Sequence, residues 1–127
     1  MKQQVEVKEL KEGKYVLEGD EPCVIKSITK SKPGKHGSAK ARIEAIGIFD
    51  GQKRSIISSV SAKTYVPIVE RKTAQVLSIS GDVAQLMDME DYSTFELSIP
   101  EQFKDRVAEG GDITYLTSMG KMKIDLR

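Results

Sequence analysis

The chain has 127 residues, with 20 lysines and arginines against 19 aspartates and glutamates, which leaves a formal charge of +1. This length suits one ordinary domain or two very small ones, and 39% hydrophobic with 31% charged residues excludes disordered and coiled-coil chains. Apolar runs such as residues 45–49 are too short to span a bilayer, and residues 1–10 lack the apolar core of a signal peptide. A single cysteine, Cys23, excludes an internal disulfide and indicates a reducing compartment, so we expect a cytoplasmic protein.

Short β-branched or aromatic runs, separated by turn residues, predict five or six strands and no helix in the first half of the chain. Asp50-Gly51 is the dipeptide expected in a two-residue hairpin turn, and Pro67 favours a strand end or a sheet edge. These features indicate a small antiparallel barrel. The predicted strands are Gln4–Val7, Tyr15–Leu17, Cys23–Ile28, Ala41–Ala45, Ser55–Val60 and Thr64–Val69.

A second domain is predicted from residue 70, at the charged break Glu70-Arg71-Lys72. Its one helix is expected between an N-cap at Ser98 and the Gly110-Gly111 stop, with Phe103 and Val107 packing it onto the sheet. Three strands, a helix and two strands are the element order of the five-stranded OB barrel. The predicted strands are Thr73–Ile79, Val83–Met87, Thr94–Ile99, Ile113–Leu116 and Met122–Leu126.

We therefore expect a mainly β protein of two small barrels, residues 1–69 and 70–127, and the two halves differ in charge. Residues 1–68 contain 13 basic and 8 acidic side chains, whereas residues 69–127 contain 7 basic and 11 acidic ones. The near-neutral total alone would argue against a nucleic-acid binder, but a positive field concentrated in the first half attracts phosphates. Between Glu21 and Glu44 every charged residue is basic: Lys26, Lys30, Lys32, Lys35, Lys40 and Arg42.

The centre of this basic stretch, Pro33-Gly34-Lys35-His36-Gly37-Ser38-Ala39-Lys40, lies between two predicted strands and is expected at the tip of a long hairpin. Gly34 and Gly37 bracket Lys35 and His36 with backbone that carries no side chain and adopts unusual turns. This arrangement would hold one lysine at a tip with little steric cover. An ordinary solvated basic turn is the alternative that composition leaves open.

The same residues do not form a known catalytic motif, because their spacing is wrong or too few of the required residues are present. A P-loop requires glycine where Thr29 stands and Ser or Thr where His36 stands. Cys23 and His36 are the only cysteine and histidine, which is too few for a structural zinc site, and no third group is signalled for a nucleophile–base pair. The acidic residues at 88–91 lack the EF-hand spacing and are expected to form a solvated turn. We predict no catalytic residues, metal or cofactor.

The residues from Pro33 to Lys40 resemble the hypusine loop of the translation factor five-A family, in the form found in archaeal members. The resemblance extends over essentially the whole chain, and the Lys-His-Gly core is far more specific than a lone glycine-rich pattern. It implies an SH3-like barrel followed by an OB fold, and a lysine, Lys35, to which deoxyhypusine synthase adds an aminobutyl group from spermidine. Pro33 and Ser38 depart from the eukaryotic pattern, so the subsequent hydroxylation of the modified lysine is left open.

The resemblance further implies a monomeric partner of the ribosome, with no membrane association. It would bind near the exit site, approach the peptidyl-tRNA acceptor end, promote peptide bond formation at stalled sequences such as consecutive prolines, and assist termination. Lys30, Lys32, Lys40 and Arg42 are expected to contact rRNA or tRNA backbone, with simple solvation as the alternative. Because the second domain is acidic, we expect it to contribute less to RNA affinity. Rival hypotheses are a generic RNA-binding module without lysine modification and a phosphate-binding enzyme that uses Lys35 and His36.

Overall fold

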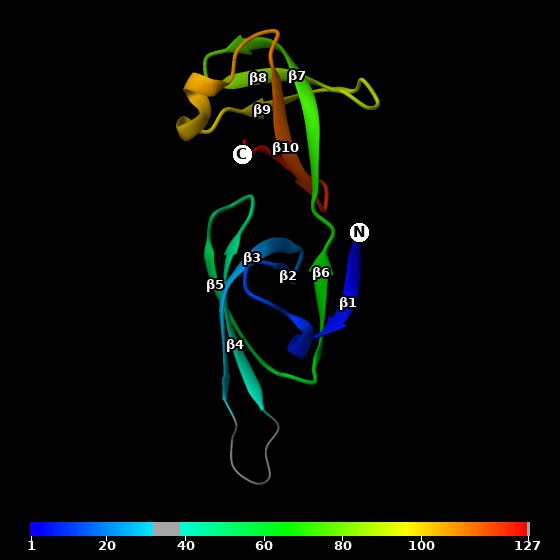
Figure 1. Ribbon diagram of the computed structural model, residues 1–127, viewed down its shortest axis with the longest axis vertical. Coiled ribbons are helices and arrows are strands. Elements are labelled where there is room, and N and C mark those ends of the chain that lie inside the picture. The colour runs from blue at the N-terminus through cyan, green and yellow to red at the C-terminus, as the bar shows by residue number, and fades with distance from the viewer. Residues whose placement is uncertain (32–38, 127) are drawn as a thin grey trace. The chain divides into compact units, whose positions relative to one another are not determined.

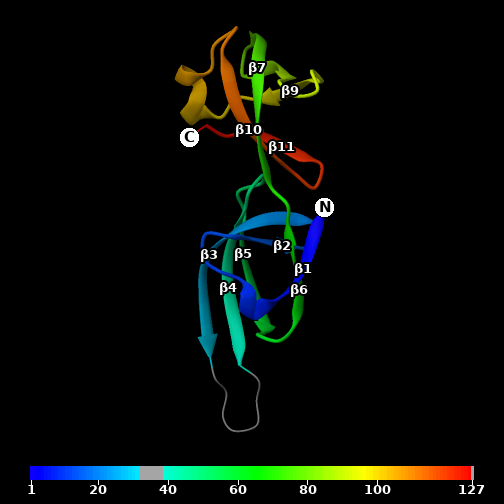
Figure 2. The same cartoon turned by 45° about the vertical axis from the view of Figure 1, so that its right-hand side comes forward.

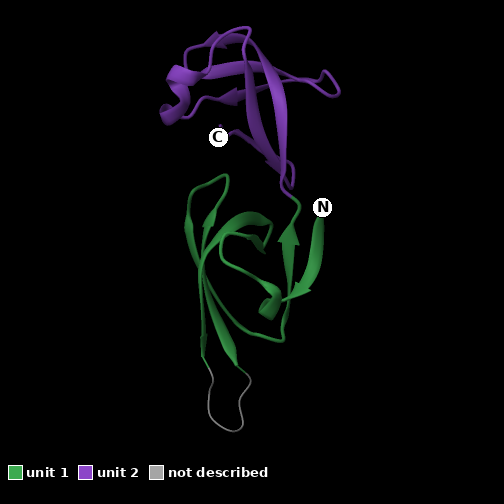
Figure 3. Ribbon diagram, in the orientation of Figure 1, with its two compact units in different colours: residues 1–68 green, residues 69–127 purple. Residues whose placement is uncertain are grey.

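The computed structural model describes residues 1–31 and 39–126. The chain forms two compact units, Met1–Ile68 and Val69–Arg127, coloured separately in Figure 3. This division falls one residue before the 69/70 boundary that the sequence suggested. Both units are built almost entirely from β-strands, as expected for a mainly β protein of two small barrels.

Unit 1 is a curled four-stranded sheet in the order β2-β3-β4-β5, with β1 and β6 paired as a separate two-stranded ribbon (Figure 1). All of these pairings are antiparallel. A short 3₁₀ helix, η1, which the sequence did not indicate, follows β1. The elements are β1 Lys2–Glu6, η1 Val7–Glu9, β2 Tyr15–Glu18, β3 Glu21–Ser31, β4 Lys40–Gly47, β5 Lys53–Ser59 and β6 Lys63–Pro67.

Strict alternation along β4 sets the inner and outer faces of this sheet. Ala41, Ile43 and Ala45 are each 1% exposed and face the core, while the residues between them face outward. Cys23 and Ile25 join that core from β3, the former 0% exposed, and burial raises the pKa of the Cys23 thiol above its usual value. The cysteine is thus a neutral packing residue.

Unit 2 is a nearly closed five-stranded barrel in the order β11-β10-β7-β8-β9, with β11 also lying against β9 (Figure 2). Its core includes Val76, Leu86, Ile113 and Tyr115, with Phe103 packed against them. The elements are β7 Glu70–Ser80, β8 Val83–Asp88, β9 Thr94–Ser98, η2 Glu101–Arg106, β10 Asp112–Ser118 and β11 Lys121–Ile124. This is the element order predicted for an OB fold.

The expected charged break at residues 70–72 is wrong, because these residues begin β7 and pair with residues 115–117 of β10. Their charges are accommodated on a barrel wall rather than in a linker. The Arg71 guanidinium donates to the Asp125 carbonyl oxygen and to Asp125 Oδ2, each at 2.5 Å, and to Thr114 Oγ1 at 3.2 Å. Charge alone therefore did not distinguish a linker from a strand whose polar side chains are paired.

The predicted helix is shorter and of another type. η2 is a six-residue 3₁₀ helix that begins after Pro100 and has no side-chain cap, so the expected capping by Ser98 is wrong. Phe103 still packs against the unit 2 core, and Val107 is buried just beyond the helix end. Pro100 cannot donate a backbone hydrogen bond, and its N-cap position moves the helix start two residues past Ser98.

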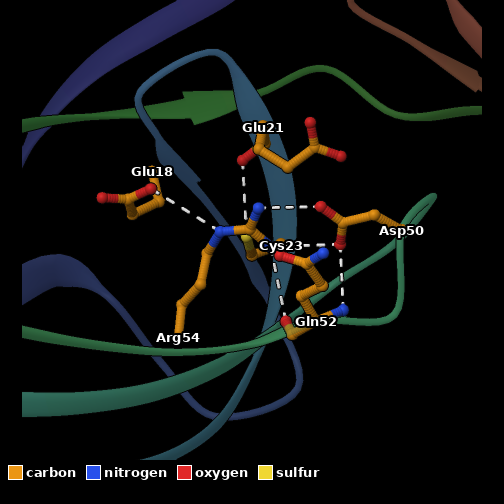
Figure 4. Close-up of polar contacts among 6 residues, drawn as sticks. All are labelled: Glu18, Glu21, Cys23, Asp50, Gln52 and Arg54. Atoms are coloured by element: carbon orange, nitrogen blue, oxygen red, sulfur yellow. Dashed lines mark hydrogen bonds and ion pairs between the residues drawn. The ribbon is translucent and has the colours of Figure 1, made fainter.

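The β4–β5 connection is also longer than the predicted two-residue turn, since β4 ends at Gly47 and β5 begins at Lys53. Asp50 and Arg54 brace this turn through two hydrogen bonds, Nη1 to Oδ1 at 3.1 Å and Nη2 to Oδ2 at 2.7 Å (Figure 4). Glu18 lies 3.6 Å from Arg54 Nε on the other side of the guanidinium. A Cβ atom at Gly47 would lie 1.9 Å from Asp50 Oδ1, so this position requires glycine for the brace to close.

The acidic turn after β8 is exposed at Glu90 and Asp91, as expected, but Asp88 is buried and holds the turn. Asp88 is 2% exposed, and its Oδ1 accepts the backbone N–H groups of Glu90 at 2.8 Å and Asp91 at 3.1 Å. Its Oδ2 accepts the Tyr115 hydroxyl at 2.5 Å. Tyr115 is 4% exposed and belongs to the core.

Candidate functional site at the β3–β4 hairpin

The candidate site is the end of the β3–β4 hairpin at which Ser31 pairs with Lys40 (Figures 1 and 2). Lys30, Lys40 and Arg42 are the sequence-predicted site residues that lie on described strands. The others lie outside the described residues: Lys32, Pro33, Gly34, Lys35, His36, Gly37 and Ser38.

The three described cations do not share one face of the hairpin. Lys40 and Arg42 alternate with core-facing Ala41 and lie on the outer face, where the Arg42 side chain is 64% exposed. Lys30 is paired with Ala41 and is therefore directed to the opposite side. The sequence grouped these cations correctly by charge, but only the strand register separates them into two faces.

Hydroxyl side chains flank the two outer cations, a feature that the sequence analysis missed. Lys40 pairs with Ser31 on one side and Ser59 on the other, while Arg42 pairs with Thr29 and Ile57. Cross-strand partners share a face, so Lys40 and Arg42 lie in rows with these neighbours. We call the cations and hydroxyl residues of the outer face, Ser27, Thr29, Ser31, Lys40, Arg42, Ser55 and Ser59, the hydroxyl-cation face. Glu44 and the exposed Ile57 lie on the same face.

Arg42 is held in place by a carboxylate on its own strand. Its Nε donates to Glu44 Oε1 at 2.8 Å, and the Ser55 hydroxyl donates to the same oxygen at 3.1 Å. These two hydrogen bonds, that from Arg42 being the stronger influence, lower the pKa of Glu44 below its usual value. The Glu44 carboxylate therefore holds the Arg42 guanidinium along β4 through a charge-assisted hydrogen bond.

This face suits a polyanionic backbone rather than catalysis. Guanidinium, ammonium and hydroxyl groups are the donors that bind phosphate and sugar oxygens without reading sequence. Within residues 1–31 and 39–126, no three His, Cys, Asp or Glu side chains are arranged to hold a metal ion. In the same part of the chain no helix is long and apolar enough to cross a membrane.

Comparisons with known proteins cover both units. Residues 2–62 match the model "Translation initiation factor 5A-like, N-terminal", and residues 68–125 match "Eukaryotic elongation factor 5A hypusine, DNA-binding OB fold". The chain belongs to the translation initiation factor 5A family. A translation initiation factor 5A from Methanococcoides burtonii is 87% identical over 127 residues and 100% of both chains. One from Archaeoglobus fulgidus is 65% identical over 125 residues, 98% of each chain.

Solved structures of 5A-family proteins agree with the fold. The "Eukaryotic translation initiation factor 5A from Methanococcus jannaschii" matches with a TM-score of 0.90 and 45% identity, covering 98% of this chain and 93% of that one. A family protein from Naegleria fowleri matches with a TM-score of 0.78 and 36% identity over 98% and 96% of the two chains. The expected SH3-like and OB-type architecture of this 5A-family chain is thereby confirmed.

Proposed function

We propose that this 5A-family chain is a translation factor, not an enzyme, that acts on the ribosome through a modified Lys35. It binds near the exit site, and Lys35, extended by an aminobutyl group, reaches the peptidyl-tRNA acceptor end. There it promotes peptide bond formation at stalled sequences such as consecutive prolines and assists termination. The observation that carries the proposal is the family match across both units: residues 2–62, which include Lys35, match the 5A-like N-terminal model, and the model that matches residues 68–125 has hypusine in its description.

The physical chemistry of lysine supports this role. A primary amine on a flexible four-carbon stem can accept the aminobutyl group that deoxyhypusine synthase takes from spermidine. The product is a long, thin dication that enters a crowded RNA site from which a folded domain is excluded. By holding the acceptor end in a reactive orientation, it would lower the entropic part of the barrier to a reaction that the ribosome itself catalyses.

The mass of the Lys35 peptide tests the modification directly. In protein purified from its native host, we expect this peptide to be heavier by one aminobutyl group, with or without a further hydroxyl. Peptides containing Lys30 and Lys40 serve as internal controls and keep their unmodified masses. An unmodified Lys35 would contradict the proposal and favour the generic RNA-binding module.

The hydroxyl-cation face is proposed to contact the RNA backbone. Replacing Arg42 with glutamine should weaken ribosome binding and reduce the slope of log affinity against log salt by about one, as expected when one phosphate contact is lost. Lys11→Gln makes the same charge change in an exposed turn of unit 1 and should leave the slope unchanged. Equal effects of both substitutions would show that only net charge matters, contrary to a defined contact at Arg42.

A further inference from the structure

The longest strand of unit 1, β3, is hydrogen-bonded to a neighbouring turn at the residue where it bends. β3 has a bulge after Ile25, and the backbone of that residue is bonded in both directions to the turn before β2. The Ile25 N–H donates to the Lys14 carbonyl, and the Gly13 N–H donates to the Ile25 carbonyl, both at 2.8 Å. Three residues further along β3, the Ile28 N–H donates to Glu12 Oε1 at 3.2 Å.

The same three hydrogen bonds recur in unit 2. β7 has a bulge after Val76, whose N–H donates to the Gly111 carbonyl and whose carbonyl accepts the Gly110 N–H, both at 2.8 Å. Three residues further along β7, the Ile79 N–H donates to Glu109 Oε1 at 3.1 Å. A Glu-Gly turn thus holds a bulged strand at equivalent atoms in both units, and we call this arrangement the Glu-Gly clasp.

Backbone conformation and register extend the equivalence. The glycine after each glutamate has positive φ, +81° at Gly13 and +83° at Gly110, a conformation that glycine adopts without strain. The strand after each clasp pairs with the residue before the bulge, Tyr15 with Val24 and Asp112 with Gln75. Glu12 and Gly13 precede β3 in the chain, whereas Glu109 and Gly110 follow β7. The shared geometry is therefore not a consequence of the same order of elements in the two units.

In unit 1 the Glu12 carboxylate accepts a hydrogen bond from β3 at a position where a neighbouring strand would otherwise pair. The pairing of β2 with β3 ends at Tyr15 and Val24, so beyond the bulge the edge of β3 away from β4 pairs with no strand in the described part of the chain. The Glu12 carboxylate binds a backbone N–H on that edge. Because a bulge bends a strand and increases its twist, this contact holds the direction in which the outer half of β3 runs.

The two clasps hold strands of different hairpins, β3–β4 in unit 1 and β7–β8 in unit 2. Beyond Ile28, β3 carries Thr29, Lys30 and Ser31 of the candidate site and leads, in sequence, to Lys35. Beyond Ile79, β7 ends at Ser80 and turns directly into β8. Glu12 therefore acts on the lysine-bearing hairpin, whereas Glu109 performs the same local task on a short turn.

We propose that Glu12 is a positioning residue for the modification of Lys35: its hydrogen bond to Ile28 fixes the direction of the outer part of β3 as far as Ser31, from which the chain leads to the lysine on which the modifying enzyme acts. This inference rests on the proposed function, because it concerns the same lysine. Glu109 is its matched counterpart, with the same bond and no part in presenting the lysine.

The test is the rate at which deoxyhypusine synthase transfers the aminobutyl group of spermidine to the intact chain, followed by mass. The transfer forms a C–N bond at the lysine nitrogen, breaks the C–N bond within spermidine and releases 1,3-diaminopropane, which takes up the proton lost by the lysine nitrogen. Glu12→Ala should lower kcat/KM by about five-fold, the effect of losing one hydrogen bond from a backbone N–H to a carboxylate, with kcat nearly unchanged. Glu12→Gln should restore most of the rate, because its amide oxygen still accepts. Glu109→Ala should leave the rate within about two-fold of wild type.

Glu9→Ala separates positioning from general destabilisation of unit 1. It removes the same charge and a comparable bond, from the Glu6 N–H to Glu9 Oε2 at 2.6 Å, in η1, whose backbone N–H groups at Val7 and Lys8 bond to Ala62 and Val60 rather than to β3. Amide hydrogen exchange provides an independent readout: Glu12→Ala should speed exchange at Ile28 while the buried amides of Ile25 and Ile43 stay protected.

Three results would overturn the inference: a wild-type rate for Glu12→Ala with faster exchange at Ile28, an equal loss of rate in Glu9→Ala, or no rescue by Glu12→Gln. Failure of the proposed function is distinguishable, since the wild-type chain itself would then accept no aminobutyl group. In that case the inference falls with it, even if exchange still shows that Glu12 holds Ile28.

Discussion

Under the proposed function, replacing Lys35 with arginine is expected to abolish the stimulation of translation through consecutive prolines. Arginine keeps the positive charge but lacks the primary amine to which the aminobutyl group is added. The rate of peptide bond formation on a proline-run template should fall by about 10- to 100-fold relative to modified wild type, the scale on which lost orientation slows a reaction. The measurement is single-turnover peptide synthesis on purified ribosomes with each protein.

Ribosome affinity separates the modified arm from simple charge in this experiment. The Lys35→Arg variant should bind ribosomes within a few-fold of unmodified wild type, since the charge is kept. Lys63→Arg makes the same substitution at an exposed position of β6 and should retain full rescue of the proline template. Rescue by Lys35→Arg equal to that of the modified wild type would show that the arm is not needed, and a generic RNA-binding module would then explain the data better.

The order of elements along the chain and the fold class were predictable because burial in small barrels leaves a period-two pattern in the sequence. Ala41, Ile43 and Ala45 alternate with outward residues, and each proved to be core. The hydroxyls of Ser27, Thr29 and Ser31 alternate as well, but their position beside Lys40 and Arg42 depends on pairing with β4, which no local pattern specifies.

Features that depend on distant residues were not predictable. Glu12 accepts a hydrogen bond from a backbone N–H 16 residues away, and Asp88 accepts one from a hydroxyl 27 residues away. The local sequence around each residue indicates only an exposed acidic side chain. The segment at 70–72 was predicted to be a charged break rather than the start of a strand for the same reason, since the Arg71 partner Asp125 is 54 residues distant. The structural role of a charged residue cannot be assigned from the sequence until the residue with which it pairs is known.

Asp88 is expected to be the most sensitive polar position in unit 2. Its carboxylate accepts three hydrogen bonds within a site that is 2% exposed. Asp88→Ala leaves two backbone N–H groups and the Tyr115 hydroxyl without that acceptor, which should lower the free energy of unfolding by about 3 kcal/mol. Asp105→Ala, at an exposed position of η2, should change it by less than about 0.5 kcal/mol.

Tyr115→Phe tests the pairing at the other end of this contact. Burial, followed by the hydrogen bond to Asp88, raises the pKa of Tyr115, so the hydroxyl remains a donor across the physiological range. Removing it leaves Asp88 Oδ2 buried without that donor, at a cost of about 1–3 kcal/mol. If the two residues act as a pair, the double variant Asp88→Ala with Tyr115→Phe should lose less stability than the two single losses combined.

The acid dependence of stability should identify Asp88 as a titrating group. The Tyr115 hydroxyl, and then the Glu90 N–H, lower the pKa of Asp88 in the folded protein, whereas in the unfolded chain it returns to about 3.9. The stabilisation is therefore complete above about pH 4 and is lost as the pH falls through the lower folded pKa. In urea unfolding followed by circular dichroism, the stability gap between wild type and Asp88→Ala should be constant from pH 7 to pH 5 and shrink below pH 4. A gap of the same size at pH 2.5 and pH 7 would show that Asp88 stabilises unit 2 by shape and packing, without a contribution from its charge.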